Sequence, residues 1–436
     1  MAARETRDRR RGAGGGSGGW VLSGVGFAGL AVMGVLYGLG SPLYGSLLRV
    51  WMMDPWPAPF LDTRTVLGWV DCRRQFGLAA YDPGVLQQCG VVGPMTYPPI
   101  WMHLPLPDPA WTALCGLALA IAFMLSLRLL PTPAGPVAQG VLLAAIFSSA
   151  AAFALERANP DLLVWLLLIA AVVAAERPVP RHATATALVT VAAILKLYPL
   201  AALVLLRRAP PGTRVALVGA ALLAVGASVA AFAPEWSLRQ PIPSGSGFLN
   251  LWGAANAWTT LPAVLPRLAG APADWPAWTG WCGAAVCAVA SLAIAARTAR
   301  TAPRPMDRAE TLLLVAAALV PACFFAAQNV AYRGIFLILA LPALLARAAP
   351  WARITAGAIL FVLWQPTERV LVATLLGGTY PTQALRRPAL ALWLAQELAW
   401  WGIVGALLGL LVPLVIRGCR GNTRSEAATP IGRSEA

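Results

Sequence analysis

Residues 51–108 read WMMDPWPAPFLDTRTVLGWVDCRRQFGLAAYDPGVLQQCGVVGPMTYPPIWMHLPLPD and separate two long hydrophobic runs, 20–50 and 109–130. Each run is long enough to cross a bilayer as a helix. The stretch between them holds five of the chain's 18 acidic residues: Asp54, Asp62, Asp71, Asp82 and Asp108. A long acidic loop between the first two apolar runs predicts a polytopic membrane protein with room for a catalytic site outside the bilayer.

The composition excludes an ordinary soluble protein. Of the 436 residues, 58% are hydrophobic and 12% are charged, whereas soluble domains carry roughly 25% charged residues. Because unpaired backbone groups are not tolerated in lipid, the spans must be helices or barrel strands. The apolar runs are too long for barrel strands. We therefore expect an all-α integral membrane protein, with no soluble domain and no internal repeat.

The net charge of +15 predicts orientation rather than nucleic-acid binding. The basic residues gather in short segments such as RETRDRRR, RTARTAPRPMDR and RGCRGNTR. Such segments stay on the cytoplasmic side of a membrane. We expect a basic cytoplasmic arm (1–19), a transmembrane domain (20–417) and a cytoplasmic tail (418–436). The Ala-, Gly- and Arg-rich usage is typical of a high-GC bacterium, which indicates the inner membrane.

Eleven hydrophobic segments follow the arm, and one of them is interrupted. Segment 183–206 is broken by KLYP (196–199) and followed by the basic RRAPPGTR, so both of its ends belong on the cytoplasmic side. A single crossing cannot do this. We therefore predict a re-entrant pair of short helices, broken at Lys196 to Pro199, beside about ten transmembrane helices. The same topology places 51–108, 234–274 and about 366–391 on the outer face.

Cysteine and histidine spacing indicates no metal centre. None of the seven cysteines has zinc-site spacing, and His103 and His182, the only histidines, lie far apart in sequence. Phosphate-binding loops and dinucleotide fingerprints are absent. Cys72 and Cys89 share the first loop and could be either bridged or free. No cofactor is expected, and a requirement for a divalent metal stays open.

Asp62 is the main catalytic candidate. A carboxylate just past the first span could act as a general base toward a hydroxyl group. Alternatively, Asp62 with Thr63 and Thr65 could cap a short amphipathic helix over TRTVLGWVDCRRQF. Asp71 would face elsewhere on that helix and could pair with a nearby arginine. Asp82, in YDPG, is typical of a turn.

Lys196 lies about ten residues from either end of its apolar run. An intramembrane lysine is costly unless it serves a cavity, and it could bind phosphate as a point charge. The structural alternatives are snorkelling or an ion pair with Asp161 or Glu156. Arg333, in QNVAYRG, could hold a phosphate or anchor a helix end. The motifs Y-P-P-I-W (97–101) and E-R-A-N-P-D (156–161) could equally be an aromatic belt and a tight polar turn.

These motifs occur in a recognisable order. A first-loop Asp is followed by G-x-x-x-Y-D-P (77–83), Y-P-P (97–99), R-x-N-x-D (157–161) and K-x-Y-P (196–199). The chain resembles the polytopic glycosyltransferases of the C superfamily (GT-C). It is most similar to their bacterial mannosyltransferase-like branch and shares K-x-Y-P with the glycosylphosphatidylinositol mannosyltransferase. The resemblance covers about 20–210, and beyond that it depends on N-x-x-Y-R (329–333).

The resemblance implies an inverting sugar transfer from a polyprenyl-phosphate sugar to an extracytoplasmic glycan or lipid acceptor. Asp62 would be the general base, and Lys196 and Arg333 would hold the donor phosphate. The cavity would be lined by Tyr97, Arg157, Asn159, Asp161, Tyr198, Asn329 and Tyr332. The paired acidic motif of many members is missing, because Asp62 is followed by Thr-Arg-Thr. An inactive envelope scaffold therefore stays an alternative.

A transporter or flippase is the alternative from a different class of protein. Broken helices and buried charges near the middle of the membrane also occur in transporters. Against this alternative, the sequence has no visible repeat and its first loop is unusually long and acidic. The expected partners are the lipid bilayer and a lipid-linked sugar, with no nucleic acid.

Overall fold

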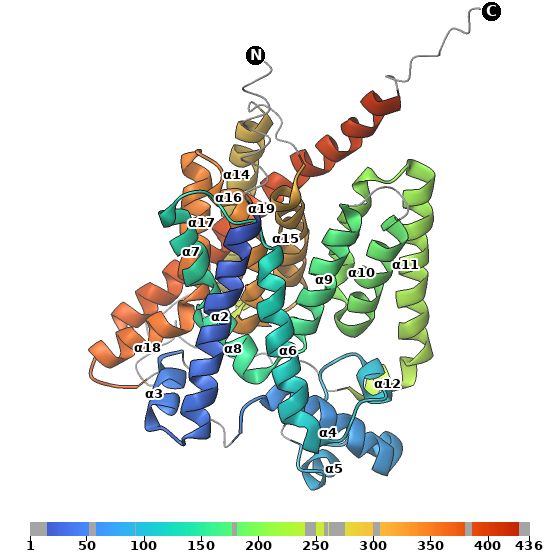
Figure 1. The fold of residues 1–436 in the computed structure, drawn as a ribbon, viewed down its shortest axis with the longest axis vertical. Helices are drawn as coiled ribbons and strands as arrows, with labels where there is room; N and C mark the ends of the chain where they lie inside the picture. Colours follow the sequence, from blue (N-terminus) through green and yellow to red (C-terminus); the bar gives the residue numbers. More distant parts are fainter. Residues whose placement is uncertain are drawn as a thin grey trace, which may run out of the picture.

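The computed structural model describes residues 15–51, 58–91, 93–176, 181–239, 250–256, 260, 275–299, 306–379 and 386–426. They form a bundle of helices with one two-stranded sheet (Figure 1). The prediction of an all-α membrane protein is confirmed. The helix α2 (Gly15–Gly38) begins inside the predicted arm, and α19 (Arg387–Glu426) runs into the predicted tail. The division into arm, membrane domain and tail stays a prediction.

Within the described residues, six helical segments are long and apolar enough to cross a membrane. They are Gly18–Gly38, Pro109–Leu129, Pro136–Arg157, Pro211–Ala231, Arg308–Ala326 and Arg387–Ile416. The shorter apolar helices are Asp161–Ala175, His182–Lys196, Trp281–Arg297 and Ala331–Leu345. A 15-residue helix is about 22 Å long, less than the roughly 30 Å hydrocarbon core. The count of ten spans therefore stays a prediction.

Besides α2 and α19, the bundle consists of further α-helices and 3-10 helices. In chain order they are α6 (Thr112–Ser126), η4 (Leu127–Leu129), α7 (Pro136–Ile146), α8 (Ser149–Arg157), α9 (Asp161–Ala175), α10 (His182–Lys196), η6 (Tyr198–Arg208), α11 (Pro211–Ala231), α14 (Trp275–Ala299), α15 (Arg308–Ala326), η8 (Ala331–Ala340), α16 (Leu341–Leu345), α17 (Pro350–Leu363) and α18 (Gln365–Leu375).

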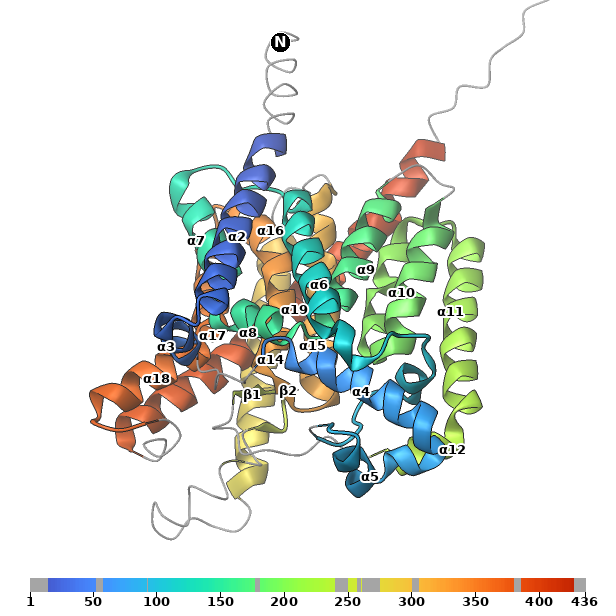
Figure 2. The same cartoon turned by 60° about the horizontal axis from the view of Figure 1, so that its bottom comes forward.

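The hydrophobic stretch 352–372 is divided between two helices. α17 and α18 meet there at 64°. Pro366 lies in the first turn of α18, where it has no N–H to donate and clashes with the preceding turn. This bend directs α18 outward along the same end of the molecule as the first loop (Figure 2).

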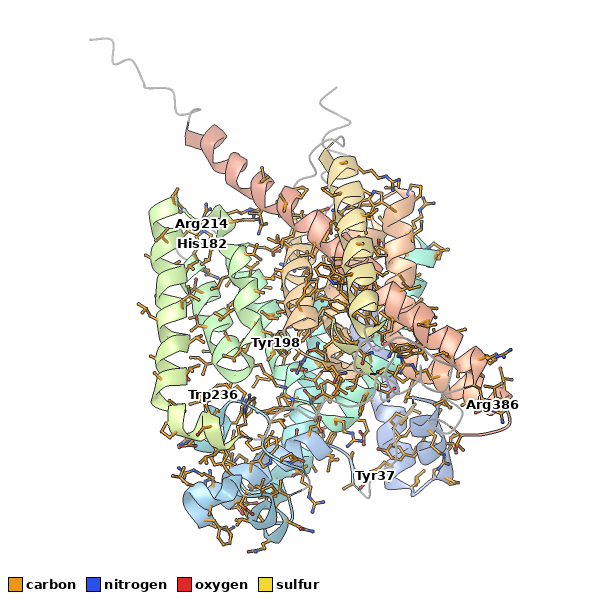
Figure 3. All side chains as sticks on the ribbon, turned by 180° about the vertical axis from the view of Figure 1, so that it is seen from behind. Tyr37, His182, Tyr198, Arg214, Trp236 and Arg386 are labelled. Carbon is orange, nitrogen blue, oxygen red and sulfur yellow. A yellow bond between two sulfur atoms is a disulfide. The ribbon has the colours of Figure 1, made fainter. Side chains whose placement is uncertain are left out.

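The interrupted segment reverses direction at the predicted position. Leu197, between α10 and η6, adopts φ 49° and ψ −53°, and η6 then packs against α10. His182 and Arg214 lie at one end of the bundle, while Tyr198 lies partway along it (Figure 3). The hairpin formed by α10 and η6 therefore starts and ends at the same end of the bundle. Lys196 and Tyr198 lie at its tip.

The first loop has a hydrophobic core of its own. The loop contains α4 (Leu61–Phe76), η1 (Gly77–Tyr81), α5 (Pro83–Gln88) and η2 (Pro99–His103), and it is flanked by α3 (Pro42–Val50) and η3 (Pro109–Trp111). Trp69, Tyr81 and Met95 are buried together, and a Cys72–Cys89 disulfide closes the loop. The Trp101 indole donates to the Leu195 carbonyl (2.9 Å), which joins this core to the hairpin tip.

Two features near the loop end of the bundle were not predicted. The short helix α12 (Ala233–Leu238) follows α11 and lies beside the first loop (Figure 1). The strands β1 (Leu251–Trp252) and β2 (Asn329–Val330) pair antiparallel. The pairing fixes Asn329 and the start of η8, which carries Arg333.

Candidate active site

Asp62 is held by a side chain 97 residues away. The Asn159 Nδ2 donates to Asp62 Oδ2 at 2.6 Å, and Asp62 lies in the first turn of α4. The capping residue of α4 is Phe60, which provides no side-chain hydrogen bond. The helix predicted over this segment is confirmed, but the cap prediction for Asp62 is wrong. Its carboxylate points to another part of the molecule instead.

The turn between α8 and α9 positions both ends of this contact. Ala158 adopts a left-handed conformation (φ 42°), and Thr63 Oγ1 donates to its carbonyl at 2.8 Å. The Asp161 N–H donates to Asn159 Oδ1 at 2.8 Å. Because the amide oxygen of Asn159 is engaged there, its NH₂ group faces Asp62. The turn therefore orients a donor toward the candidate base.

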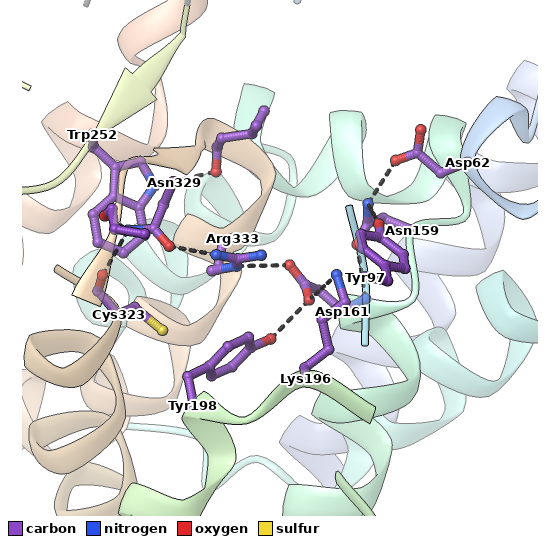
Figure 4. Close-up of polar contacts among 12 residues, drawn as sticks. Asp62, Tyr97, Asn159, Asp161, Lys196, Tyr198, Trp252, Cys323, Asn329 and Arg333 are labelled. Carbon is purple, nitrogen blue, oxygen red and sulfur yellow. Dashed lines mark hydrogen bonds and ion pairs between the residues drawn. The ribbon is translucent and has the colours of Figure 1, made fainter. Parts of the chain in front are cut away.

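Asp161 is the centre of a buried charge cluster (Figure 4). Its Oδ1 lies 3.1 Å from Lys196 Nζ, and its Oδ2 lies 3.1 Å from Arg333 Nε. The Tyr198 hydroxyl donates to Oδ1 at 2.7 Å. The predicted alternative of a Lys196–Asp161 pair is thus present. Yet two cations share one carboxylate, so the cluster carries an excess positive charge.

Aromatic rings and Asn329 hold the two cations in place. Lys196 Nζ lies 3.8 Å from the centre of the Tyr97 ring, and Arg333 Cζ lies 4.9 Å from that of Tyr198. These are cation–π distances. The Arg333 guanidinium also donates to Asn329, whose amide donates to the Cys323 and Ala327 carbonyls. Asn329 therefore acts as a support for Arg333.

The remaining predicted residues lie around this centre. The Asn159 amide is 3.3 Å from the Tyr97 hydroxyl, which places Tyr97 beside both Asp62 and Lys196. Tyr332 packs edge-on against Phe153, with ring centres 5.5 Å apart. Arg157 Nε lies 3.1 Å from a Glu156 oxygen. Chain positions from 62 to 333 are thus brought into one region.

The surroundings of Asp62 change its acidity. Burial raises the pKa of the Asp62 carboxyl above its usual value, although the Asn159 hydrogen bond and the positive charges of Arg157 and Lys196 oppose this rise. A raised pKa makes the carboxylate a stronger base toward an alcohol. The Asn159 donor favours the charged form of the carboxyl.

A second polar cluster fastens the first loop to α12. Glu235 accepts hydrogen bonds from the Tyr81 hydroxyl (2.6 Å) and His103 Nε2 (2.9 Å), and Arg73 lies 3.6 Å away. Burial alone would raise the pKa of Glu235, but these hydrogen bonds hold it below its usual value. The sequence analysis did not identify Glu235, for which the only signal was a carboxylate directly after a span.

Two further acidic residues of the first loop have local roles. The Asp71 carboxylate accepts a hydrogen bond from Gln75 rather than from an arginine, and Asp82 caps α5.

The part of the chain that the structure describes contains no group of three or more His, Cys, Asp or Glu side chains that could hold a metal ion. The central polar groups of the site are the carboxylates of Asp62 and Asp161, the cations Lys196 and Arg333, amides and phenols. Such a set can accept a proton from a hydroxyl group and bind an anion a short distance away.

Comparison with known proteins identifies the family. The profile of glycosyltransferase family 87 matches residues 93–326, more than half of the chain. Asn159, Asp161 and Lys196 fall inside the match. No curated protein and no solved structure shows significant similarity to the chain. The prediction of a GT-C-type polytopic glycosyltransferase is confirmed, but the match does not specify which sugar is transferred. The chain belongs to glycosyltransferase family 87 and is a membrane glycosyltransferase.

Proposed function

We propose that the protein transfers a sugar from a polyprenyl-phosphate donor to an acceptor hydroxyl on the outer face of the bacterial inner membrane, with inversion at the anomeric carbon. The observation that carries this proposal is the separation of a held carboxylate, Asp62, from a cationic pair, Lys196 and Arg333. The carboxylate is suited to removing a proton from the acceptor, and the cationic pair is suited to binding the donor phosphate. Mannose is the sugar we would test first.

The reaction is a single displacement. Asp62 accepts the proton of the acceptor hydroxyl as the acceptor oxygen forms a bond to the anomeric carbon. The bond from that carbon to the phosphate oxygen breaks, and polyprenyl phosphate leaves with the electron pair. Asn159 orients Asp62 and hydrogen-bonds the charged form before the transfer. The Asp62 proton is then released to water.

The cationic pair acts on the leaving group. The donor is a phosphodiester with one negative charge, and the departing monoester gains a second one. Lys196 and Arg333 contribute two positive charges, of which Asp161 balances one. The uncompensated charge therefore attracts the donor and stabilises the transition state still more strongly. Asp161 is fully buried and keeps both cations in position.

The proposed orientation places both termini in the cytoplasm. Helix α2 begins and α19 ends at the same end of the bundle, whereas α4, α5 and α12 lie at the other end (Figure 1). With the basic arm inside, the loop end faces outward. The orientation can be tested with single cysteines at Thr213 and Ser237 in a variant whose free cysteines are replaced by serine. Position 213 should react only from the cytoplasm and position 237 only from outside.

The family assignment favours an enzyme over a transporter, and the held Asp62 favours an active enzyme over a scaffold. The test compares Asp62→Asn with Asp71→Asn, a matched control on the same helix that contacts only Gln75 among the interactions described. Purified variants are assayed for transfer from radiolabelled polyprenyl-phosphate mannose to a membrane lipid extract. Asp62→Asn should lose about 10²–10⁴-fold in rate, and Asp71→Asn little. Full activity of Asp62→Asn would disprove the assignment of the base.

A further inference from the structure

The base of the hairpin, where α10 starts and η6 ends, lies opposite the first loop and carries an excess of positive charge. Six arginines belong to the described elements around this base: Arg181, Arg207, Arg208, Arg214, Arg308 and Arg347. At this end the same elements supply three carboxylates, Glu176, Asp307 and Glu310. Each carboxylate is engaged, in an ion pair with Arg308 or Arg347 or as the cap of α15. The hairpin base therefore attracts anions.

Basic side chains from three elements meet at the hairpin base. Figure 3 shows His182 of α10 and Arg214 of α11 at the same end of the bundle. The Arg214 guanidinium donates to two carbonyls at the end of η6, at 2.9 and 3.0 Å. Arg208 donates to the Met306 carbonyl at 2.7 Å and acts electrostatically on the His182 ring. Because Arg214 bonds the carbonyls that end η6, their partial negative charge is compensated and does not repel an anion there.

Two helices also present their N-termini at the hairpin base. α10 begins at His182 and α11 at Pro211, and their capping residues, Arg181 and Pro210, provide no side-chain hydrogen bond. The backbone N–H groups and the dipole at such helix ends favour anions. In addition, His182 is only 8% exposed, and its Nδ1 has no hydrogen-bond partner among the described residues. Buried polar atoms are rarely left unpaired, so this atom indicates an acceptor from outside the described chain.

The exposed side of α11 indicates that the anion is part of a lipid. This helix is long and apolar enough to cross a membrane, and Val215 and Leu223 are 73% and 76% exposed. Arg214 lies three residues after the start of α11, where a span enters the headgroup layer. A phospholipid can therefore place its phosphate beside Arg214 and its acyl chains along α11. Inorganic phosphate would use only the polar part of this surface.

We infer that the hairpin base binds the phosphate group of an anionic phospholipid such as phosphatidylglycerol. Arg208 and Arg214 contact the phosphate oxygens, and the acyl chains lie along α11. Basic pockets between membrane helices recognise headgroups of this kind, and the excess of arginine over carboxylate selects an anionic lipid over a zwitterionic one. The inference depends on the fold and not on the reaction, so it holds for any sugar, donor or acceptor.

The bound lipid would stabilise the element that carries Lys196. Helix α10 runs from His182 to Lys196, so the hairpin base lies about 21 Å from the hairpin tip. The other arm, η6, is an 11-residue 3-10 helix, and 3-10 helices of more than about four residues are uncommon because their hydrogen bonds are poorly aligned. Contact of a lipid with Arg208, the last residue of η6, should therefore reduce opening of this arm.

The binding test uses purified protein in a neutral detergent and three probes: short-chain phosphatidylglycerol, phosphatidylcholine with the same chains, and inorganic phosphate. Phosphatidylglycerol should raise the unfolding temperature saturably, and the other two probes should not. Arg208→Gln should weaken phosphatidylglycerol binding about fivefold, as expected for one arginine near an anionic headgroup. The control is Arg353→Gln, at an exposed arginine near the start of α17, which should bind within about twofold of the wild type.

Three results of this test would overturn the inference. Equal stabilisation by phosphatidylcholine would show that the acyl chains bind without the phosphate site. Equal weakening in Arg208→Gln and Arg353→Gln would show a general attraction between the protein and anionic lipid. Binding of inorganic phosphate as tight as that of phosphatidylglycerol would assign the hairpin base to a soluble anion.

Hydrogen exchange on the wild-type protein gives a second readout that needs no variant. Amides of η6 should exchange up to about fivefold more slowly in phosphatidylglycerol nanodiscs than in phosphatidylcholine nanodiscs, while those of α4 and α5 should not change. Nanodiscs expose both leaflets, so the result does not depend on the proposed orientation. Equal exchange of η6 in the two lipids would overturn the inference, whereas a failure of sugar transfer would leave it intact.

Discussion

The two halves of the site are built in different ways. Lys196, Asp161 and Arg333 belong to the helical bundle, where the buried Asp161 is in ion-pair contact with the buried Lys196 and the partly buried Arg333. Asp62 belongs to a loop with its own small core, fastened by a disulfide and by a few hydrogen bonds. The half that is proposed to bind phosphate, called the phosphate side, is therefore fixed in position by ion pairs within the bundle. The position of the base, Asp62, depends instead on how the first loop docks onto the bundle. Changes to either half should have distinguishable consequences.

On the phosphate side, loss of Lys196, the only lysine in the chain, should have the largest effect. Lys196→Met should lower transfer about 10²–10³-fold, as expected for removal of one charge-stabilising donor. Because Asp161 keeps Arg333 and Tyr198, the variant should still fold. Lys196→Arg should restore only part of the activity, since a planar fork replaces a compact ammonium. Transfer assays and thermal unfolding measure both effects.

The control for Lys196→Met is Arg308→Met, which breaks the Arg308–Glu176 pair (2.8 Å). Glu176 follows the last residue of α9, the helix that Asp161 begins, so this pair lies about 22 Å from the site. Arg308→Met should leave transfer nearly unchanged. Equal losses in the two variants would indicate a general effect of charge removal on the bundle.

The loop half should be sensitive to its disulfide. Replacing Cys72 and Cys89 by serine removes a bridge that spans 17 residues, which stabilises a loop of this length by about 3 kcal/mol. The first loop should become sensitive to protease, and transfer should fall because Asp62 is less well placed. The bundle should unfold at nearly the wild-type temperature. Cys115→Ser, at a free cysteine of α6, is the control.

The acidity of Asp62 gives a prediction on pH. Transfer should fall as pH drops through its raised pKa, because the base becomes protonated. Asn159→Ala removes a hydrogen bond that lowers this pKa, so the acidic limb of kcat/KM should move to higher pH. A limb that stays in place would show that another group controls it.

The same shift has a consequence for stability. A raised pKa means that the folded state binds the Asp62 proton more tightly than the unfolded state does. The folded state is therefore destabilised by Asp62 at pH values above that pKa and loses this penalty as pH falls through it. Asp62→Asn should consequently raise the unfolding temperature at pH 7 while abolishing transfer. A lower unfolding temperature would contradict this account of Asp62.

Glu235 should give the smallest effect, because it acts on loop position alone. Glu235→Gln weakens the contacts to Tyr81, His103 and Arg73. Amide exchange in α4 and α5 should become faster, and transfer should decline modestly at unchanged donor KM. Since the pKa of Glu235 is lowered, its contribution to stability should be lost as pH falls through that pKa. A raised donor KM would mean that the first loop also shapes the phosphate side.

The contrast also explains what the sequence could reveal. Lys196 and Asp161 can be recognised in the sequence because charged side chains inside apolar runs are energetically costly and are usually functional. The motif KLYP marks the point where the chain reverses direction. The partner of Asp62 could not be inferred, because the turn depends on Ala158 in a left-handed conformation that is usually marked by glycine. Glu235 and the β1–β2 pair likewise arise from tertiary contacts without a local pattern, whereas the bend before Gln365 has a local cause in Pro366.

The central claim is that Lys196 binds the donor phosphate while Asp62 does the proton transfer. Protein labelled with ¹⁵N at lysine Nζ carries a single such side chain, so its NMR signal reports on Lys196 alone. Titration with a short-chain prenyl phosphate should shift this signal with similar Kd in the wild type and in Asp62→Asn, which is inactive in transfer. The corresponding prenyl alcohol should cause no shift. An unshifted signal, or an equal shift with the alcohol, would contradict the assignment of Lys196 to the phosphate.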